Sequence, residues 1–300
     1  MCSEDRGILH YLPVVRRGKD FFLLLEGKQP FYIHSLFDRA INLFSGEHFL
    51  GLLPQERGGG EGYATLAISR NIFLTGLGLF PGYQVEVEKG YRVRLAPKVL
   101  VDFSFSLPWE SPLKGIKAPL TIDEEALKLL WAALKASAVA SPSKLMLEEA
   151  RGQPALLIRK WESSLLLQGP AGVEEALEEL IGWGPGLTPS GDDFVLGLSL
   201  TRAIWRKAYG LQEGIWEKKV ASLLGRTLPL SAFFLKEALQ GRGHEFIEKV
   251  LACAVGETPR EMGEAVKKLL GVGGSSGFDM ALGVYFGLEW QRRDNWCLNE

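Results

Sequence analysis

The sequence predicts an α+β protein, with a mostly antiparallel, barrel-like β domain over residues 1–117 and an all-α domain over residues 118–300. Three observations support this prediction. Alternation of apolar and polar residues with period two dominates the first hundred residues. Helical spacing dominates the remainder. The stretch SLPWESPLKGIKAP between them is rich in proline and indicates a linker.

The β half contains six strand-like segments joined by short glycine-rich connections. The connection RGGGEG at residues 57–62 is one of them. In the last segment, alternating residues flank a turn at Lys89-Gly90. Many short strands with such connections fit a closed or nearly closed antiparallel sheet better than a parallel one. The six segments are LHYLPVV, DFFLLLEG, AINLF, HFLGLLP, YATLAI and QVEVEKGYRVRLA.

The helical half opens with a capping-box sequence at Thr121 to Glu124. The residues Ile122, Ala126, Leu129, Leu130 and Ala133 follow at helical spacing, which predicts one apolar face. Further helices are predicted over residues 155–167, 172–181, 192–209, 215–224, 231–239, 245–253, 259–270 and 278–290.

Composition and charge exclude several classes of protein. The chain has 300 residues, of which 46% are hydrophobic and 23% charged, as in a globular protein. Its net charge of −2 and scattered basic residues argue against nucleic-acid binding. The acidic start with Glu4 and Asp5 does not resemble a secretory signal, and no apolar run is long enough to span a membrane. Three distant cysteines suggest no disulfide framework or zinc site. We therefore expect a soluble, cytoplasmic protein.

One motif occurs twice: Ser-Gly-x-Asp, followed by three residues and a glycine, at residues 190–197 and again at residues 276–283. A repeated helix cap explains it most simply. The hydroxyls of Ser190 and Ser276 would each bond the amide three residues on, and Asp193 and Asp279 would each return a bond. Such a capping box contributes about 1 kcal/mol.

Three further features favour a ligand site at the same two places. Glycine-rich sequences, GWGPG and GVGG, precede the two motifs, and glycines let a backbone pass close to a ligand. Both following helices are apolar nearly all round, which predicts an interior position. Asp192 has no acidic counterpart in the second motif, so the shared cap does not require it. Asp192 is therefore the first candidate for chemistry, followed by Asp193.

The glycines inside the two helices, Gly197 and Gly283, predict close helix packing. If the two helices lie side by side, both motifs face one cleft. Helix N-termini attract anions whereas two adjacent carboxylates repel them, so a ligand with donor groups, such as a carboxamide, fits better than a bare phosphate. A phosphate bridged by Mg²⁺ is the alternative. No nucleotide-binding signature is present.

Four blocks of the sequence resemble the AllH-like family, one member of which is assigned as a subunit of oxamate carbamoyltransferase. The blocks are GWGPGLTPSGDDFVLG, LSAFFLKEALQG, GVGGSSGFDMALG and the N-terminal HSLFDRAINL. Trp183 and Gly274 depart from the family pattern.

The resemblance implies transfer of a carbamoyl group between carbamoyl phosphate and oxamate in purine or allantoin catabolism, together with other enzyme subunits as partners. The chemistry needs a base, oxyanion donors and a cation for the phosphate. Asp192 or Asp193 is the candidate base, and Arg39 or Arg242 the candidate cation. Candidate substrate-binding residues are Gly184, Gly186, Thr188, Ser190, Gly191, Ser275, Ser276, Gly277, Asp279, Arg39, Asn42 and His34.

Two alternatives remain open. The loops could hold a regulatory ligand in a non-catalytic or scaffolding subunit, or the chain could be a metal-dependent hydrolase using Asp192, Asp193 and Asp279. His34 and His244 fit structural roles better than catalytic ones. Ser231 fits an N-cap.

Overall fold

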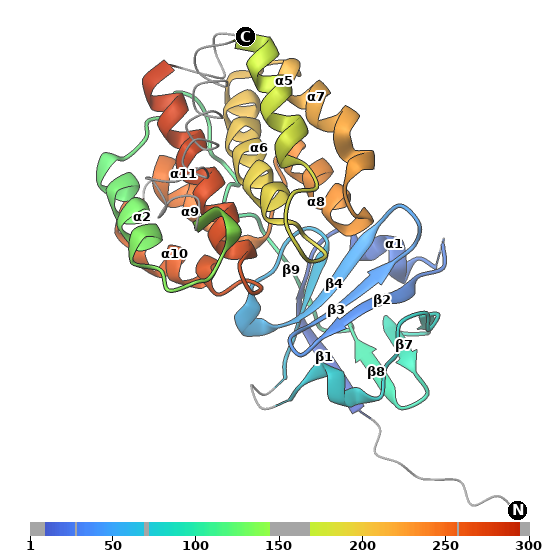
Figure 1. Cartoon of the computed structure of the whole chain (residues 1–300). Helices are drawn as coiled ribbons and strands as arrows, with labels where there is room; N and C mark the ends of the chain where they lie inside the picture. The colour runs from blue at the N-terminus through green and yellow to red at the C-terminus, as the bar shows by residue number, and fades with distance from the viewer. Residues whose placement is uncertain (1–9, 28, 69–71, 145–168, 257, 295–300) are drawn as a thin grey trace, which may run out of the picture. The chain divides into compact units, whose positions relative to one another are not determined.

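A computed structural model describes residues 10–27, 29–68, 72–144, 169–256 and 258–294 of the chain. Residues 1–111 and 112–300 form two compact units, and each is described by itself. The first unit is built mainly from strands and the second from helices, so the predicted α+β class is confirmed. Figure 1 shows both units with most of their helices and strands labelled.

The N-terminal unit is a curled sheet with the strand order β2-β3-β4-β5-β1-β8-β7-β6, in which β9 also pairs with β1. Among the described strands, five pairings are antiparallel, whereas β4 with β5, β1 with β8 and β1 with β9 are parallel. The sheet is therefore mixed, although antiparallel pairs predominate. The strands are β1 (His10–Arg17), β2 (Tyr32–Phe37), β3 (Ala40–Phe44), β4 (Phe49–Pro54), β5 (Tyr63–Leu66), β6 (Glu86–Glu88), β7 (Arg92–Ala96), β8 (Val99–Asp102) and β9 (Leu107–Pro108).

The two ends of this sheet nearly meet. Tyr32 on the edge strand β2 forms an antiparallel bridge with Gln84, two residues before β6 begins. Ile33 accepts an amide hydrogen bond from Gly82 at 2.7 Å and donates one to Tyr83 at 2.8 Å. These bonds satisfy an edge that would otherwise be open, which gives the sheet its barrel-like form.

Local sequence explains the strand turns well. The predicted hairpin at Lys89-Gly90 joins β6 to β7, and Gly90 supplies the positive φ of 79° that the turn requires. In β3, Ile41 and Leu43 are buried and their neighbours partly exposed, as alternation predicts. β4 differs, because all six of its residues are buried. The short helix α1 (Phe21–Leu25) adds Phe21 and Leu24 to the same core.

The C-terminal unit is a helical bundle with its own apolar core. Its helices are α2 (Glu124–Ala136), α5 (Gly169–Leu180), α6 (Ser190–Tyr209), α7 (Ile215–Leu223), α8 (Pro229–Leu239), α9 (Glu245–Val255), α10 (Met262–Leu270) and α11 (Ser276–Asp294). Helix α6 runs through the middle, with α11 on one side and α5 and α8 on the other (Figure 1). The helix predicted over residues 155–167 lies outside the described residues.

The first helix of the bundle begins later than predicted. Asp123, not Thr121, is the N-cap of α2, and its carboxylate accepts the amide hydrogen of Ala126 at 2.7 Å. The buried face consists of Ala126, Leu127, Leu130 and Leu134, whereas Leu129 is exposed. The amide of Asp123 donates to the carbonyl oxygen of Ala254 in α9 at 2.8 Å, so a contact with another helix fixes the start of α2.

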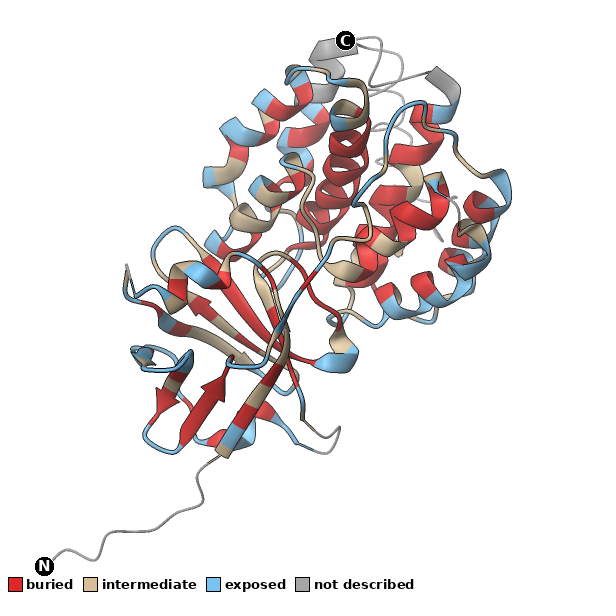
Figure 2. Cartoon of the chain, turned by 180° about the vertical axis from the view of Figure 1, so that it is seen from behind, coloured by how far each residue is buried: buried red, intermediate tan, exposed pale blue. Residues whose placement is uncertain are grey.

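Helix α6 is buried on all sides, as its apolar sequence predicts. Every residue from Ser190 to Trp205 is buried, and Figure 2 shows the central helix of the bundle red along most of its length. A polar start on such a helix must find partners inside the protein for its hydroxyl and carboxylate groups. Among the described residues, no helix is long and apolar enough to cross a membrane.

Candidate functional site

The two echoed motifs lie together in the bundle. Helices α6 and α11 cross at their glycines: a Cβ atom on Gly197 would lie 2.2 Å from the carbonyl oxygen of Met280, and one on Gly283 would lie 2.1 Å from that of Phe194. At the helix starts, the hydroxyl oxygens of Thr188 and Ser276 are 3.0 Å apart. The prediction that the two helices pack side by side and present both motifs to one place is confirmed.

The echo in the sequence is a structural repeat of a helix, a tight loop and a second helix. The amide of Gly191 donates to Trp183 at 2.9 Å, and the amide of Gly277 donates to Val272 at 3.0 Å. A Cβ on Gly191 would lie 2.0 Å from the Leu180 carbonyl oxygen, and one on Gly277 1.8 Å from that of Leu269. Glycine is thus required at these two positions for packing against the preceding helix.

The predicted capping boxes do not form. Ser190 and Ser276 are the first residues inside their helices, and the N-cap of α6 is Pro189, which makes no side-chain cap. The serine hydroxyls instead bond across the helix pair: Ser190 to Asp279 and Ser276 to Asp193. The capping prediction was wrong because the serine hydroxyls and aspartate carboxylates that would form the caps form the bonds between the two helices instead. Close packing at the glycines brings the opposite carboxylate within reach.

Asp193 and Asp279 are the two acidic groups at the centre of this exchange. Only 3% of Asp193 and 0% of Asp279 is exposed. Burial raises the pKa of Asp193 well above its ordinary value, and the negative charges of Asp279 and Asp192 raise it further, against hydrogen bonds from Ser276 and Thr188. Burial also raises the pKa of Asp279, against the hydrogen bonds of its surrounding serines. Both carboxyls therefore favour the neutral form more than an exposed aspartate does.

Asp192 faces away from this pair and is held from three directions. Its carboxylate accepts the amide hydrogen of Gly182 at 2.7 Å and hydroxyl hydrogens from Thr227 and Ser231, the latter at 2.6 Å. It is 1% exposed. Asp192 thus ties the loop before α6 to the start of α8. This geometry favours a structural role, and the catalytic role that the sequence suggested for Asp192 stays a prediction.

The rest of the predicted loop residues divide into packed and open positions. Gly184 has a φ of 111°, and a Cβ there would lie 2.8 Å from the Ser190 nitrogen, so Gly184 packs against the first residue of α6. Gly186 has a φ of 98° with open space around it. Thr188, Ser275 and Ser276 are partly exposed, whereas Ser190 is buried. A ligand approaching the helix starts would therefore first meet Gly186, Thr188, Ser275 and Ser276.

The three remaining candidates, His34, Arg39 and Asn42, belong to the N-terminal unit. His34 lies 3.2 Å from the hydroxyl of Ser35 and packs edge-on against two phenylalanine rings, and burial lowers its pKa. Asn42 donates to the same Ser35 hydroxyl at 2.9 Å. Arg39 forms an ion pair with Glu56 and donates to the carbonyl oxygen of Ile72 at 2.9 Å. All three side chains have partners within their own unit.

Sequence reasoning missed several residues of the site. The Ser141 hydroxyl donates to Asp279 at 2.5 Å, and Ser143 also bonds this carboxylate. Their sequence, Ser-Pro-Ser, gave no signal beyond that of a turn. Ser231 lies inside α8 rather than at its N-cap, so the N-cap prediction was wrong. His244 is instead the N-cap of α9 and accepts from the amide of Phe246 at 3.3 Å, which confirms its structural role.

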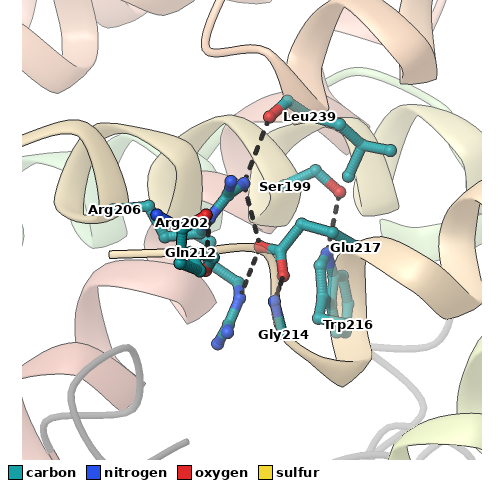
Figure 3. Close-up of polar contacts among 8 residues, drawn as sticks. All are labelled: Ser199, Arg202, Arg206, Gln212, Gly214, Trp216, Glu217 and Leu239. Atoms are coloured by element: carbon teal, nitrogen blue, oxygen red, sulfur yellow. Dashed lines mark hydrogen bonds and ion pairs between the residues drawn. The ribbon is translucent and has the colours of Figure 1, made fainter. Parts of the chain in front are cut away.

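A second buried polar network lies further along α6 (Figure 3). The Arg202 guanidinium donates to Glu217 at 2.8 Å, and Arg206 approaches the same oxygen at 3.4 Å. The other oxygen of Glu217 accepts the amide hydrogen of Gly214 at 2.8 Å, at the start of α7. Arg202 and Glu217 are 1% and 2% exposed. This network fixes α7 and its preceding loop against α6, and so supports the helix that carries Asp192 and Asp193.

The described residues define an α+β protein whose helical unit brings two buried carboxyl groups together at a repeated helix start. The family model described as oxamate carbamoyltransferase subunit AllH matches residues 180–288, which include both echoed loops. The resemblance predicted from the three C-terminal blocks is thereby confirmed, whereas the block at residues 34–43 lies outside the match. No solved structure matches the chain.

Proposed function

We propose that this chain is a subunit of an oxamate carbamoyltransferase, and that it binds the carbamoyl or carboxamide substrate where the loops before α6 and α11 meet. One observation supports this most strongly. The cluster of hydroxyl and carboxyl groups formed by Thr188, Ser276, Asp193 and Asp279 lies within the region that matches the AllH family model. The proposed reaction converts carbamoyl phosphate and oxamate into oxalurate and phosphate.

This reaction needs a proton acceptor, because an amide nitrogen is a poor nucleophile while it keeps both protons. Asp193 is buried beneath Thr188 and Ser276, and its carboxylate accepts hydrogen bonds from both. A hydroxyl can therefore take the proton of the amide nitrogen and pass its own proton to Asp193. The nitrogen lone pair then forms a bond to the carbamoyl carbon, and the bond from that carbon to the phosphate oxygen breaks.

The two helix N-termini supply the electrostatic part of the site. Helix N-termini carry partial positive charge and unsatisfied amide groups, which stabilise an oxyanion. The open glycine Gly186 lets a ligand approach the backbone of the first loop closely. Asp193 and Asp279 oppose anion binding only to the extent that they are ionised, and burial favours their neutral forms.

The leaving phosphate also needs a positive charge, and the partner subunits are the proposed source. The two arginines that the sequence suggested are both engaged by carboxylates: Arg39 by Glu56, and Arg242 by Glu237. An arginine held in this way is less available to a phosphate. A site completed by a second subunit agrees with the family description, which names a subunit rather than a whole enzyme.

A second candidate function is a non-catalytic subunit in which the same loops bind a regulatory carboxamide. The burial of both carboxyl groups favours it, because only 3% of Asp193 is exposed to a substrate. The metal-dependent hydrolase receives less support. In the described part of the chain, no group of three or more histidine, cysteine or acidic side chains is arranged to hold a metal. A role for Mg²⁺ stays a prediction.

The test is phosphate release from carbamoyl phosphate in the presence of oxamate, measured for the chain combined with its partner subunits. Thr188→Val and Ser276→Ala each remove a hydroxyl of the proposed relay, and each should lower kcat by about 100-fold or more. Ser190→Ala is the matched variant, since Ser190 holds the equivalent position in the repeat but is buried against Asp279. It should lower the rate by about ten-fold at most.

Full activity in Thr188→Val and Ser276→Ala would exclude the catalytic relay. If these variants turn over normally but lose regulation by oxamate, the non-catalytic function is correct instead. Loss of activity after exhaustive chelation, restored by Mg²⁺ alone, would favour the hydrolase chemistry.

A further inference from the structure

The two buried carboxyl groups leave one feature of the site unexplained. The Oδ2 atoms of Asp193 and Asp279 are both buried, and neither has a hydrogen-bond partner among the described residues. The Oδ1 atom of Asp279 accepts from Ser141 at 2.5 Å. In each carboxyl group, therefore, Oδ2 is a buried acceptor without a donor, although the group accepts hydrogen bonds through its other oxygen. Buried polar atoms of this kind are rare in folded proteins.

The charges around the pair make this arrangement costly for two ionised groups. Asp279, on α11, and Asp192, next in sequence on α6, are the charged groups that act most strongly on Asp193. The other groups bonded to the pair are hydroxyls: Thr188 and Ser276 on Asp193, and Ser141, Ser143, Ser190 and Ser275 on Asp279. Two buried like charges with hydroxyls around them repel each other strongly.

A single proton on the pair removes both the unpaired acceptors and the repulsion between two buried negative charges. If one carboxyl is protonated, its O–H group becomes a donor, and the second carboxylate supplies the acceptor. A bond between the two Oδ2 atoms would give both of these unpaired atoms a partner. One negative charge then remains, and the surrounding serine and threonine hydroxyls stabilise it.

We propose that Asp193 and Asp279 hold one proton between them, and that this shared-proton pair is the acceptor behind Thr188 and Ser276. Asp279 is then a positioning residue that acts through Asp193. A lone buried Asp193 that was fully protonated could not accept a proton. Sharing with Asp279 keeps one carboxylate of the pair ionised and ready to take the proton that leaves the amide nitrogen.

The shared proton can be tested without any enzyme activity. Infrared difference spectra at pH 7 compare the whole chain with its Asp193→Asn and Asp279→Asn variants and detect the C=O stretch of a protonated carboxyl. In each variant the asparagine amide donates to the remaining carboxylate and keeps it ionised. Both difference spectra should therefore contain the band of one protonated carboxyl. Asp102→Asn is the control, because Asp102 has a pKa of about 2 and is ionised at pH 7. Its difference spectrum should lack the band.

Three results would overturn the proposal. The band could be missing from both spectra, so that both groups are ionised. It could appear in one spectrum alone, so that the proton belongs to one residue. It could appear only after chelation and dialysis, so that a cation occupies the place of the proton. If one variant does not fold, the wild-type spectrum compared with the other variant still distinguishes a protonated carboxyl from two ionised ones.

The role in catalysis rests on the proposed function and has its own readout. In the reconstituted enzyme, Asp279→Ala should move the acidic limb of the pH profile of kcat/KM to higher pH by about one unit or more, because ionised Asp193 then loses the donor that stabilises it. Asp279→Asn keeps a donor there and should leave the limb nearly in place. A fall in rate with an unchanged pH profile in Asp279→Ala would overturn the positioning role of Asp279. An infrared band without turnover would refute the proposed function alone. Turnover without the band would refute the shared proton alone.

Discussion

The crossing of α6 and α11 makes a quantitative prediction, because Gly197 and Gly283 contact each other directly. A Cβ on Gly197 would lie 2.2 Å from the Met280 carbonyl oxygen and 2.8 Å from the Val284 nitrogen. An ordinary contact needs at least 3.4 Å, so Gly197→Ala forces the helices apart by about 1 Å. Overpacking of this kind lowers the free energy of unfolding by up to about 3 kcal/mol, and the better helix propensity of alanine raises it by about 1 kcal/mol. We therefore expect Gly197→Ala to lower the free energy of unfolding by about 2 kcal/mol.

A matched variant separates crowding from helix propensity. Gly263 lies in α10, and a Cβ built there meets nothing within 4 Å. Gly263→Ala should therefore stabilise the protein by up to about 1 kcal/mol, which makes the two variants differ by about 3 kcal/mol. The assay is urea unfolding of the intact chain. The double variant Gly197→Ala with Gly283→Ala should cost less than the sum of the single changes, because one separation of the helices accommodates both methyl groups. Equal stability of Gly197→Ala and Gly263→Ala would refute the close packing.

Three further variants test other parts of the molecule. Glu217→Ala leaves Arg202 buried without its ion-pair partner and should destabilise the chain by about 3 kcal/mol or more in urea unfolding; a loss below 1 kcal/mol would contradict the buried pair. Asp102 is buried, which on its own raises its pKa, but hydrogen bonds from Ser104, Tyr11 and Arg92 outweigh this and hold the pKa at about 2. The lowered pKa contributes about 2 kcal/mol to the free energy of unfolding above pH 4, and this contribution is lost as pH falls towards 2. In Asp102→Asn, the free energy of unfolding should therefore fall less steeply between pH 4 and pH 2. An unchanged dependence on pH in this range would refute the assignment. Asp192→Ala leaves the amide of Gly182 and the hydroxyls of Thr227 and Ser231 without their acceptor, and it should lower the melting temperature even with ligand bound. An unchanged melting temperature would contradict the structural role of Asp192.

The sequence predicts the repeat and its helices well, because both depend on local patterns. Apolar residues on every side of α6 predict its burial, and glycines at matching positions predict the close crossing. Local patterns do not predict which hydrogen-bond partner a side chain chooses. Ser190 can bond Asp193 as a cap or Asp279 across the interface, and only the distance between the two helices decides between them.

Long-range partners are even less accessible from the sequence. The Ser141 hydroxyl reaches Asp279 across 138 positions, and no spacing rule connects them. The same is true of the donors that hold Asp192, 35 and 39 positions away. In the sheet, β1 pairs with β8 in parallel, although alternation alone does not distinguish a parallel from an antiparallel neighbour. Local patterns thus place the elements, and packing selects which polar groups meet.

The most direct test of the account is peptide-level hydrogen exchange of the chain with its partner subunits, with and without oxamate. Exchange should slow on ligand binding in both loops, residues 182–188 and 271–276, and in Ser276→Ala this protection should weaken in both together. Helix α9 should exchange alike in both states. Protection confined to one loop, or found only outside the two loops, would contradict a single site at the place where they meet.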